Sequence, residues 1–123
     1  MSTVTLNAPE KAAEFFAGKL DFTVTPVELS EQIENGVKSF IVDVREAINF
    51  IKGHIPGAIN LPKGNWSHIT GWRNDRPVII YGYSHICHLA ARAAVEFASQ
   101  GHSVIEMEGG FAAWKESRLH VEI

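Results

Sequence analysis

Short apolar runs alternate with amphipathic stretches along the chain, and this alternation is the first guide to its fold. The apolar runs have the length and composition of strands, and a near-continuous run is typical of a strand buried on both faces. The expected strands are 21–24, 39–44, 58–61, 78–81 and 103–107. The expected helices are 8–17, 26–34, 46–51, 88–99 and 111–116. We therefore predict an α/β domain with a parallel or mostly parallel sheet and helices on both faces.

The first helix precedes this alternating pattern and is predicted to form an extension. Gly18 is expected to end it, because a glycine after the apolar positions commonly terminates a helix. We divide the chain into an N-terminal helical extension, 1–20, and a domain, 21–123. The Phe15-Phe16 pair gives the extension an apolar face, which either packs on the domain or forms a homodimer contact.

Local signals are clear in the second helix and weak in one later segment. Thr25 and Glu28 have capping-box spacing, with a proline at the first helical position between them. By contrast, 63–75 is polar and weakly periodic, so we expect a loop with a short helix there. Its Trp66 and Trp72 either line a pocket or pack against the core.

The composition narrows the kinds of partner that the protein could bind and the compartment in which we expect it. The formal net charge of -3 gives no reason to expect nucleic acid or an anionic membrane as a partner. No apolar run is long enough to span a bilayer, and the first residues lack a signal-peptide pattern. One cysteine cannot form an intramolecular disulfide, so we expect a cytoplasmic protein.

The segment from Val78 to Phe97 is the part of the chain to which we assign chemistry. A strand is followed by a short loop and then by an Ala-rich helix, so backbone N–H groups converge at the positive end of the helix dipole. Such a concave backbone suits an anion: a thiolate, a persulfide, a sulfate or a phosphate. The candidate loop residues are Gly82, Tyr83, Ser84, His85, Ile86, Cys87 and His88.

Cys87, the only cysteine, has two interpretations that the sequence leaves open. A helix N-terminus stabilises a thiolate, and His85 or His88 could assist it or move a proton, which makes Cys87 the candidate catalytic residue. Alternatively, Cys87 is a small apolar residue buried between helix and sheet, where it is inert. Gly82 could be required for a positive φ or for a close approach of backbone.

The remaining polar residues are interpreted mainly as support for the loop. A zinc site could be drawn from the histidines and cysteine of the loop with His54, but no strong ligand pair accompanies them, so we expect no metal and no cofactor. Asp43 and Arg45 follow a predicted strand; either Arg45 lends charge to a pocket, or the two form a buried ion pair. The ion pair is the preferred interpretation, and His54 is expected to pack within its turn.

Three motifs occur in a fixed order along the chain. The first is Asp43-Val44-Arg45 followed by 53–62, which reads GHIPGAINLP. The second is the strand, loop and helix of 78–97, and the third is 108–114, which reads EGGFAAW. Together they resemble the signature of rhodanese-like domains, over about Thr25 to Lys115.

The resemblance implies one α/β domain with a central five-stranded, mostly parallel sheet. Active members of the family carry sulfane sulfur on a loop cysteine as a persulfide. They move it from a small sulfur-containing anion such as thiosulfate to an acceptor such as cyanide or a protein thiol. The same scaffold also serves dual-specificity phosphatases and many non-enzymatic copies.

This chain departs from the family pattern at the nucleophile. The family places its cysteine directly after the strand, where this chain has Gly82, whereas Cys87 comes later in the loop. No arginine lies within the loop, which disfavours phosphatase chemistry. Two hypotheses remain: a sulfurtransferase whose persulfide is carried by Cys87, and a catalytically inactive module that binds an anion or a partner protein through the same loop.

Overall fold

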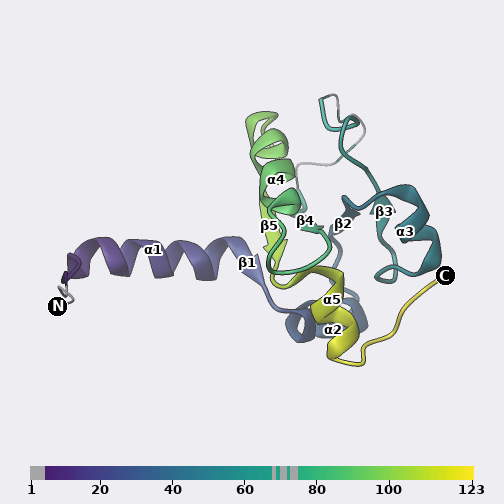
Figure 1. The fold of residues 1–123 in the computed structure, drawn as a ribbon, viewed down its shortest axis with the longest axis horizontal. Coiled ribbons are helices and arrows are strands. Elements are labelled where there is room, and N and C mark those ends of the chain that lie inside the picture. The colour runs from purple at the N-terminus through teal and green to yellow at the C-terminus, as the bar shows by residue number, and fades with distance from the viewer. Residues whose placement is uncertain (1–4, 68, 70–71, 73–74) are drawn as a thin grey trace, which may run out of the picture.

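The computed structural model describes residues 5–67, 69, 72 and 75–123, and a five-stranded parallel sheet lies at its centre (Figure 1). The strands are β1 (Thr23–Val24), β2 (Phe40–Asp43), β3 (Ile59–Asn60), β4 (Val78–Tyr81) and β5 (Val104–Met107). The helices are α1 (Pro9–Phe22), α2 (Pro26–Glu34), α3 (Ala47–Lys52), α4 (Leu89–Ser99) and α5 (Gly110–Glu116). The spatial order is β1-β5-β4-β2-β3 and every pairing is parallel, which confirms the predicted class and sheet.

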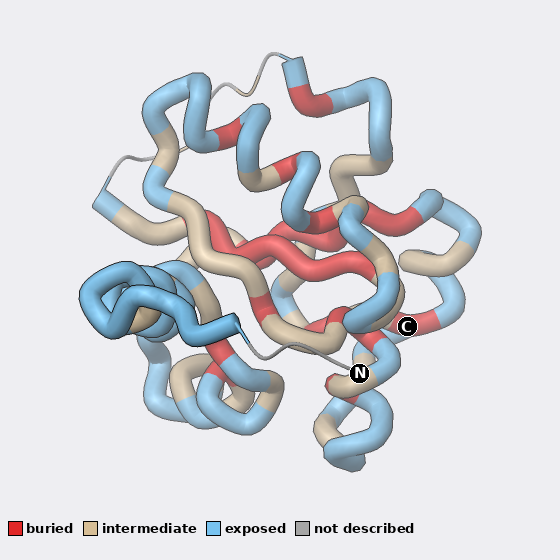
Figure 2. The backbone as a smooth tube through the Cα atoms, turned by 60° about the vertical axis from the view of Figure 1, so that its left-hand side comes forward, coloured by how far each residue is buried: buried red, intermediate tan, exposed pale blue. Residues whose placement is uncertain are grey.

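Each face of the sheet is covered by helices. On one face Ile79 of β4 packs in a core cluster with Leu29 of α2 and Trp114 of α5. On the other face the next residue, Ile80, packs in a second cluster with Phe97 of α4. Successive side chains of a strand point to opposite faces, so a strand between two helical layers is apolar at every position. Figure 2 shows these buried strands running through the interior.

The predicted capping box begins α2. The Thr25 Oγ1 accepts a hydrogen bond from the Glu28 N–H (3.2 Å), and the Glu28 carboxylate accepts one from the Thr25 N–H (2.9 Å). These hydrogen bonds with the Thr25 backbone and side chain lower the pKa of Glu28. The helix ends before Asn35 and Gly36, as the sequence indicated.

The predicted end of the first helix was wrong. The helix α1 continues through Gly18 to Phe22, and the chain becomes extended at Thr23, where φ is -132°. Glycine ends a helix by adopting a positive φ, and Gly18 does not have one. Of the two alternatives for the Phe15-Phe16 face, the structure does not show packing on the domain, because both side chains are exposed. No helix in the described part of the chain is long and apolar enough to cross a membrane.

The segment 63–75 contributes packing rather than regular structure. Its described residues contain turns and no helix, and residues 68, 70–71 and 73–74 lie outside the described part of the chain. Trp72 stacks on Phe40, and both Trp66 and Trp72 make edge contacts with the ring of Phe97. The two tryptophans therefore close the α4 side of the core.

Candidate functional site

The β4–α4 loop, residues 82–88, leaves the carboxyl end of a central strand and is fastened to α5. The Gly82 carbonyl accepts a hydrogen bond from the Phe111 N–H at 2.9 Å. The Tyr83 carbonyl accepts one from the Ala112 N–H at the same distance, 2.9 Å. The loop is thus held by the first turn of α5, far along the chain.

Gly110 makes this close approach possible. It has φ +62°, and a Cβ at this position would lie 2.6 Å from the backbone nitrogen of Ser84 and 2.8 Å from the carbonyl oxygen of Gly82. Backbone atoms held by hydrogen bonds cannot move aside for a side chain. The second glycine of the EGGFAAW motif therefore serves the β4–α4 loop.

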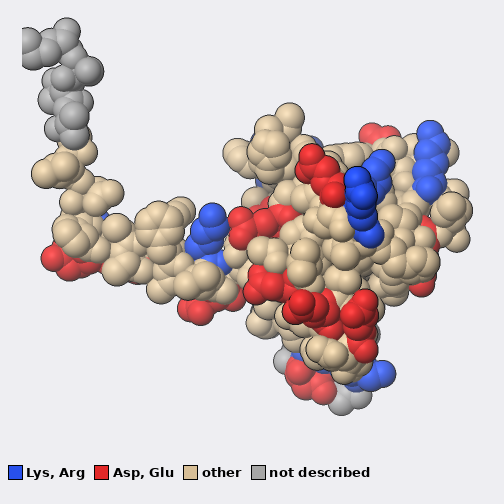
Figure 3. Space-filling model, turned by 90° about the horizontal axis from the view of Figure 1, so that it is seen from below, with Lys and Arg blue, Asp and Glu red and all other residues tan. Residues whose placement is uncertain are grey.

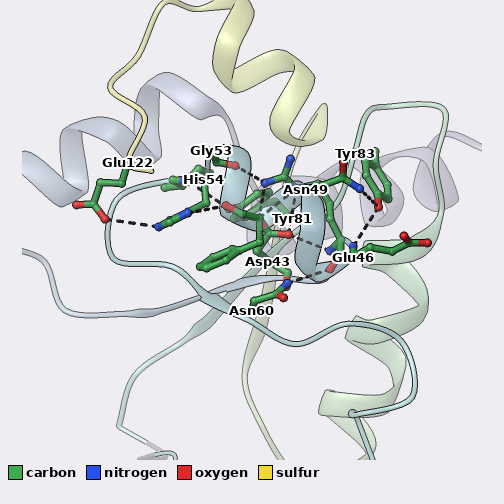
Figure 4. Close-up of polar contacts among 12 residues, drawn as sticks. Asp43, Glu46, Asn49, Gly53, His54, Asn60, Tyr81, Tyr83 and Glu122 are labelled. Carbon is green, nitrogen blue, oxygen red and sulfur yellow. Dashed lines mark hydrogen bonds and ion pairs between the residues drawn. The ribbon is translucent and has the colours of Figure 1, made fainter.

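Tyr83 fastens the other side of the loop to α3. Its hydroxyl oxygen accepts hydrogen bonds from the Glu46 N–H (3.0 Å) and from the Asn49 side-chain amide (2.9 Å). Figure 4 shows the Tyr83 side chain reaching across to these two residues. The phenol occupies the N-terminus of α3, so Tyr83 positions the loop.

The predicted ion pair of Asp43 and Arg45 lies beneath the loop. The Arg45 guanidinium is 2.7 Å from the Asp43 carboxylate and also donates to the Gly53 carbonyl at 2.7 Å. Asp43 is fully buried, Arg45 is 4% exposed, and the guanidinium lies over the ring of Phe111. The guanidinium group of Arg45 therefore has its partners in the protein interior. Arg45 lines neither of the two surface hollows that adjoin Cys87.

His54 likewise makes its contacts within its own neighbourhood. Its ring stacks on Phe50, its Nδ1 lies 2.9 Å from the Phe50 carbonyl oxygen, and its Nε2 lies 3.7 Å from the Glu122 carboxylate. A backbone bridge with Glu122 ties the C-terminal segment to the same turn. The structure therefore does not bring His54 together with Cys87.

Tyr81, the last residue of β4, lies buried beside this ion pair. Its hydroxyl accepts a hydrogen bond from the Ile55 N–H at 3.1 Å. Burial, with the nearby Asp43 carboxylate, raises the pKa of Tyr81 above its ordinary value. Tyr81 therefore stays protonated and acts as a structural group below the loop.

Cys87 is half-buried and stands between two hollows. The larger, about 570 Å³, is also lined by Tyr83, Ser84, Ile86, His88, Leu89 and Arg92. The smaller, about 200 Å³, is also lined by Thr23, Ser84, His85, His88, Ala91, Glu106, Glu108 and Gly109. Cys87 is therefore reachable from outside and has both predicted histidines as neighbours in the smaller hollow.

Backbone N–H groups are available around Cys87. The Cys87 N–H itself donates to the Ser84 carbonyl at 3.1 Å. Within the described residues, the N–H groups at 83–86 and 88–91 donate to no backbone carbonyl. These groups belong to the loop and to the first turn of α4, where the helix dipole is positive. The arrangement has the donors that an anion requires.

Arg92 is a residue of this site that the sequence analysis missed. It lies in α4 and lines the larger hollow together with Cys87. Its N–H donates to the His88 carbonyl at 3.0 Å, so it stands one helical turn beyond the loop. Arg92 lies beyond the loop in sequence, but four-residue spacing in a helix places His88 and Arg92 on one side.

Two carboxylates on the smaller hollow were also missed. Burial and the neighbouring charge of Glu108 raise the pKa of Glu106, while His88 acts in the opposite direction. The sequence predicts Glu106 only as part of the strand 103–107, because nothing in the local pattern distinguishes a strand residue that faces a loop. The two sides of Cys87 therefore differ in charge, basic toward Arg92 and acidic toward Glu106.

The interpretation of Gly82 as a conformational requirement was wrong. Gly82 does not have a positive φ, and a Cβ there would meet the Ala90 nitrogen and Cβ at 3.6 Å and 3.7 Å, which are ordinary contacts. A side chain at position 82 would thus face the first turn of α4. The backbone itself accepts the cysteine that the resemblance places there.

The described part of the chain offers no set of side-chain ligands for a metal ion. No group of three or more His, Cys, Asp or Glu side chains there is arranged to hold a metal ion.

Comparison with known proteins identifies the family to which this fold and loop belong. The family described as Rhodanese-like domain matches residues 25–117. Among curated proteins, the thiosulfate sulfurtransferase GlpE of Shewanella oneidensis is 39% identical over 79 residues, which are 63% of this chain and 76% of that protein.

Two solved structures show the same fold. A protein of Bacillus halodurans superposes with a TM-score of 0.84 at 30% identity, covering 94% of this chain and 86% of that one. The rhodanese-like domain of an Anabaena protein superposes with a TM-score of 0.71 at 26% identity, covering 81% of this chain and 77% of that one.

Proposed function

The chain belongs to the rhodanese-like domain family, and from this premise we propose that it is a sulfurtransferase that carries sulfane sulfur on Cys87. One observation carries the proposal: the only cysteine is half-buried in the β4–α4 loop, at the N-terminus of α4. Similarity to a thiosulfate sulfurtransferase supports thiosulfate as the donor. A protein with one free thiol suits a reducing compartment, so we place it in the cytoplasm.

The proposed reaction has two balanced steps. The Cys87 thiolate attacks the outer sulfur of thiosulfate, a new S–S bond forms, and sulfite leaves with the electron pair of the broken S–S bond. An acceptor, either cyanide or a protein thiolate, then attacks the outer sulfur of the persulfide. The Cys87 thiolate leaves, and the acceptor departs as thiocyanate or as a protein persulfide.

The charges around Cys87 support each step. The N–H groups of the loop and of the first turn of α4 donate to no backbone carbonyl of the described residues and lie at the positive end of the helix dipole, so they can stabilise the thiolate and the persulfide anion. On the larger hollow, Arg92 supplies a fixed positive charge for an anionic donor and for departing sulfite. His88 borders both hollows and is placed to exchange a proton with an acceptor thiol.

The alternative function is a catalytically inactive module that binds an anion or a partner protein through the same loop. The observation that favours it is Gly82, because the backbone does not require glycine at the position where the family has its nucleophile. In this account the N–H groups of the loop bind an anion without reacting with it.

Thiocyanate formation from thiosulfate and cyanide distinguishes the two accounts. We expect activity in the natural protein and a loss of about 100-fold or more in Cys87→Ser, since a hydroxyl cannot carry the persulfide. A double variant, Gly82→Cys with Cys87→Ser, tests whether a thiol at the family position restores turnover in the same loop. Activity in the double variant alone would support the inactive module and contradict catalysis by Cys87.

A further inference from the structure

The helix α1 stands off the domain as an arm. Figure 3 shows it extending from one side of the molecule, and none of its residues is buried. Its attachment lies at its C-terminal end, where the Lys19 ammonium is 3.6 Å from the Glu108 carboxylate and the Thr23 hydroxyl donates to the Lys19 carbonyl. These contacts set the direction of the arm and leave most of its length uncovered.

The arm exposes an unusual amount of apolar surface. The exposed fractions are 66% for Phe15, 58% for Phe16, 81% for Leu20 and 61% for Phe22, with Leu6 before the helix at 87%. Glu10, Glu14 and Asp21 lie together on the opposite side of the helix, because they are spaced by about whole turns. The arm is therefore amphipathic, with its apolar face turned away from any part of its own chain.

A helix of this length needs a partner to be stable. It has 14 residues, and an isolated helix of that size is marginal in water even with favourable residues. A contiguous aromatic face of this kind marks an interaction site. The contacts near Lys19 cover only its last turns, so its first half must be stabilised by something other than its own domain.

We propose that this face is covered by α1 of a second copy of the chain, in an antiparallel pair with a two-fold axis near Phe16. In that register Phe16 meets its own copy, and Ala12 lies opposite Leu20 on the same face of the helix. Large side chains on one helix then face small ones on the other, which is how packed helices interdigitate. A two-fold interface uses the same patch on both copies, so this self-matching is what a homodimer requires.

The apolar area of two arms, if fully covered, reaches the lower limit of a specific interface. With about 200 Å² for a full aromatic side chain, the exposed apolar residues of the arm present roughly 600 Å² on each copy. Two copies together would bury about 1,200 Å² of apolar side chain, which reaches the lower limit of specific interfaces before backbone and polar area are added.

The arm is also a shared structural feature. The superposition on the Bacillus halodurans protein covers 94% of this chain, and the residues after Phe22 fall well short of that share. Much of α1 is therefore matched there, in the same place relative to the sheet. A helix that merely frayed from the domain would not keep a common direction in another protein.

Solution mass tests the dimer directly. Light scattering or sedimentation of the natural protein should give twice the mass of one chain, and Phe16→Asp should weaken the dimer by roughly 100-fold or more, because the change removes an apolar contact from both copies. The matched control is Glu14→Gln, on the charged side of the same helix, which should leave the dimer intact. A monomeric natural protein, or a dimer indifferent to Phe16→Asp, would overturn the proposal and leave the face to a different partner.

A cysteine scan tests the antiparallel register. In a Cys87→Ser background, Phe16→Cys should form a disulfide-linked dimer under mild oxidation, since the two copies of position 16 meet at the axis. Glu14→Cys should not form a disulfide-linked dimer under the same conditions. Equal cross-linking at both positions, or none at position 16 in a protein that is dimeric by mass, would refute this arrangement. Circular dichroism and melting of each variant confirm that the domain remains folded.

Discussion

Gly82 and Cys87 stand at opposite ends of one loop, and the chemistry of the protein depends on which position carries a thiol. Gly82 does not have a positive φ, and a Cβ at this position would make no close contacts, so the backbone here does not require glycine. Cys87 has the hollows, the neighbouring histidines and the free N–H groups around it. These surroundings are the reason that we propose Cys87, among single residues, as the carrier of sulfur.

The acidic side of Cys87 gives a pH-dependent prediction. Burial and Glu108 raise the pKa of Glu106, so the folded protein binds the Glu106 proton more tightly than the unfolded chain. The stability that this proton contributes is complete below the unfolded pKa, about 4.3, and is lost as the pH rises through the folded value. Glu106→Gln should therefore melt above the natural protein at pH 7 and close to it at pH 4.

Thermal melts at the two pH values check this prediction, with Glu96→Gln as the matched control, because Glu96 is exposed on α4 and does not line the smaller hollow. The opposite result would be a Glu106→Gln variant that melts below the natural protein at pH 7 and close to it at pH 4. That result would show that ionised Glu106 is stabilised by a partner such as His88.

At the level of elements, the β4–α4 loop is shaped by two helices that are distant in sequence. The first turn of α5 holds the Gly82 and Tyr83 carbonyls, and the Tyr83 hydroxyl occupies the N-terminus of α3. The loop is thus fixed on both sides while its N–H groups remain available. This explains why the EGGFAAW motif accompanies the loop although it contributes no group to the proposed reaction.

Gly110→Ala should detach the loop from α5. A methyl group there would lie 2.6 Å from a loop nitrogen, and φ is +62°, so we expect a loss of about 1–3 kcal/mol in stability and a fall in thiocyanate formation. Gly57→Ala is the control, because φ is +81° but nothing lies within 4 Å. Denaturant unfolding and the turnover assay measure both. Equal effects of the two substitutions would show that the contact with the loop is unimportant.

Elements whose signals are local were predictable from sequence. The central strands β2 and β4 were found because burial on both faces makes them almost continuously apolar, and α2 because Thr25 and Glu28 form a reciprocal cap. The end of α1 was not, because glycine is compatible with both a helix interior and a helix end, and only the φ of Gly18 decides.

The functional site was only partly predictable for a related reason. The loop and Cys87 are contiguous in sequence and could be selected as candidates, and the Asp43–Arg45 ion pair, whose partners are two residues apart, was predicted correctly. Arg92 and Glu106 reach the site from a helix and from a neighbouring strand. Their contribution depends on how elements pack, which no local pattern records.

At the scale of the whole molecule, the protein combines a rhodanese-like domain with an uncovered arm. The α1 arm joins the domain beside Glu108, and Glu108 lines the smaller hollow next to Cys87. A dimer through α1 would therefore fix the direction of both arms. Each arm would join its domain close to the acidic side of the candidate site at Cys87. The fold and the arm can be tested separately, because the site lies entirely within one chain.

The most direct test of the central claim is the intact mass of the protein after incubation with thiosulfate. We predict a gain of one sulfur atom in the natural protein, its removal by cyanide, and no gain in Cys87→Ser. A folded natural protein that gains no sulfur, or a Cys87→Ser variant that gains it equally, would contradict the assignment of persulfide chemistry to Cys87.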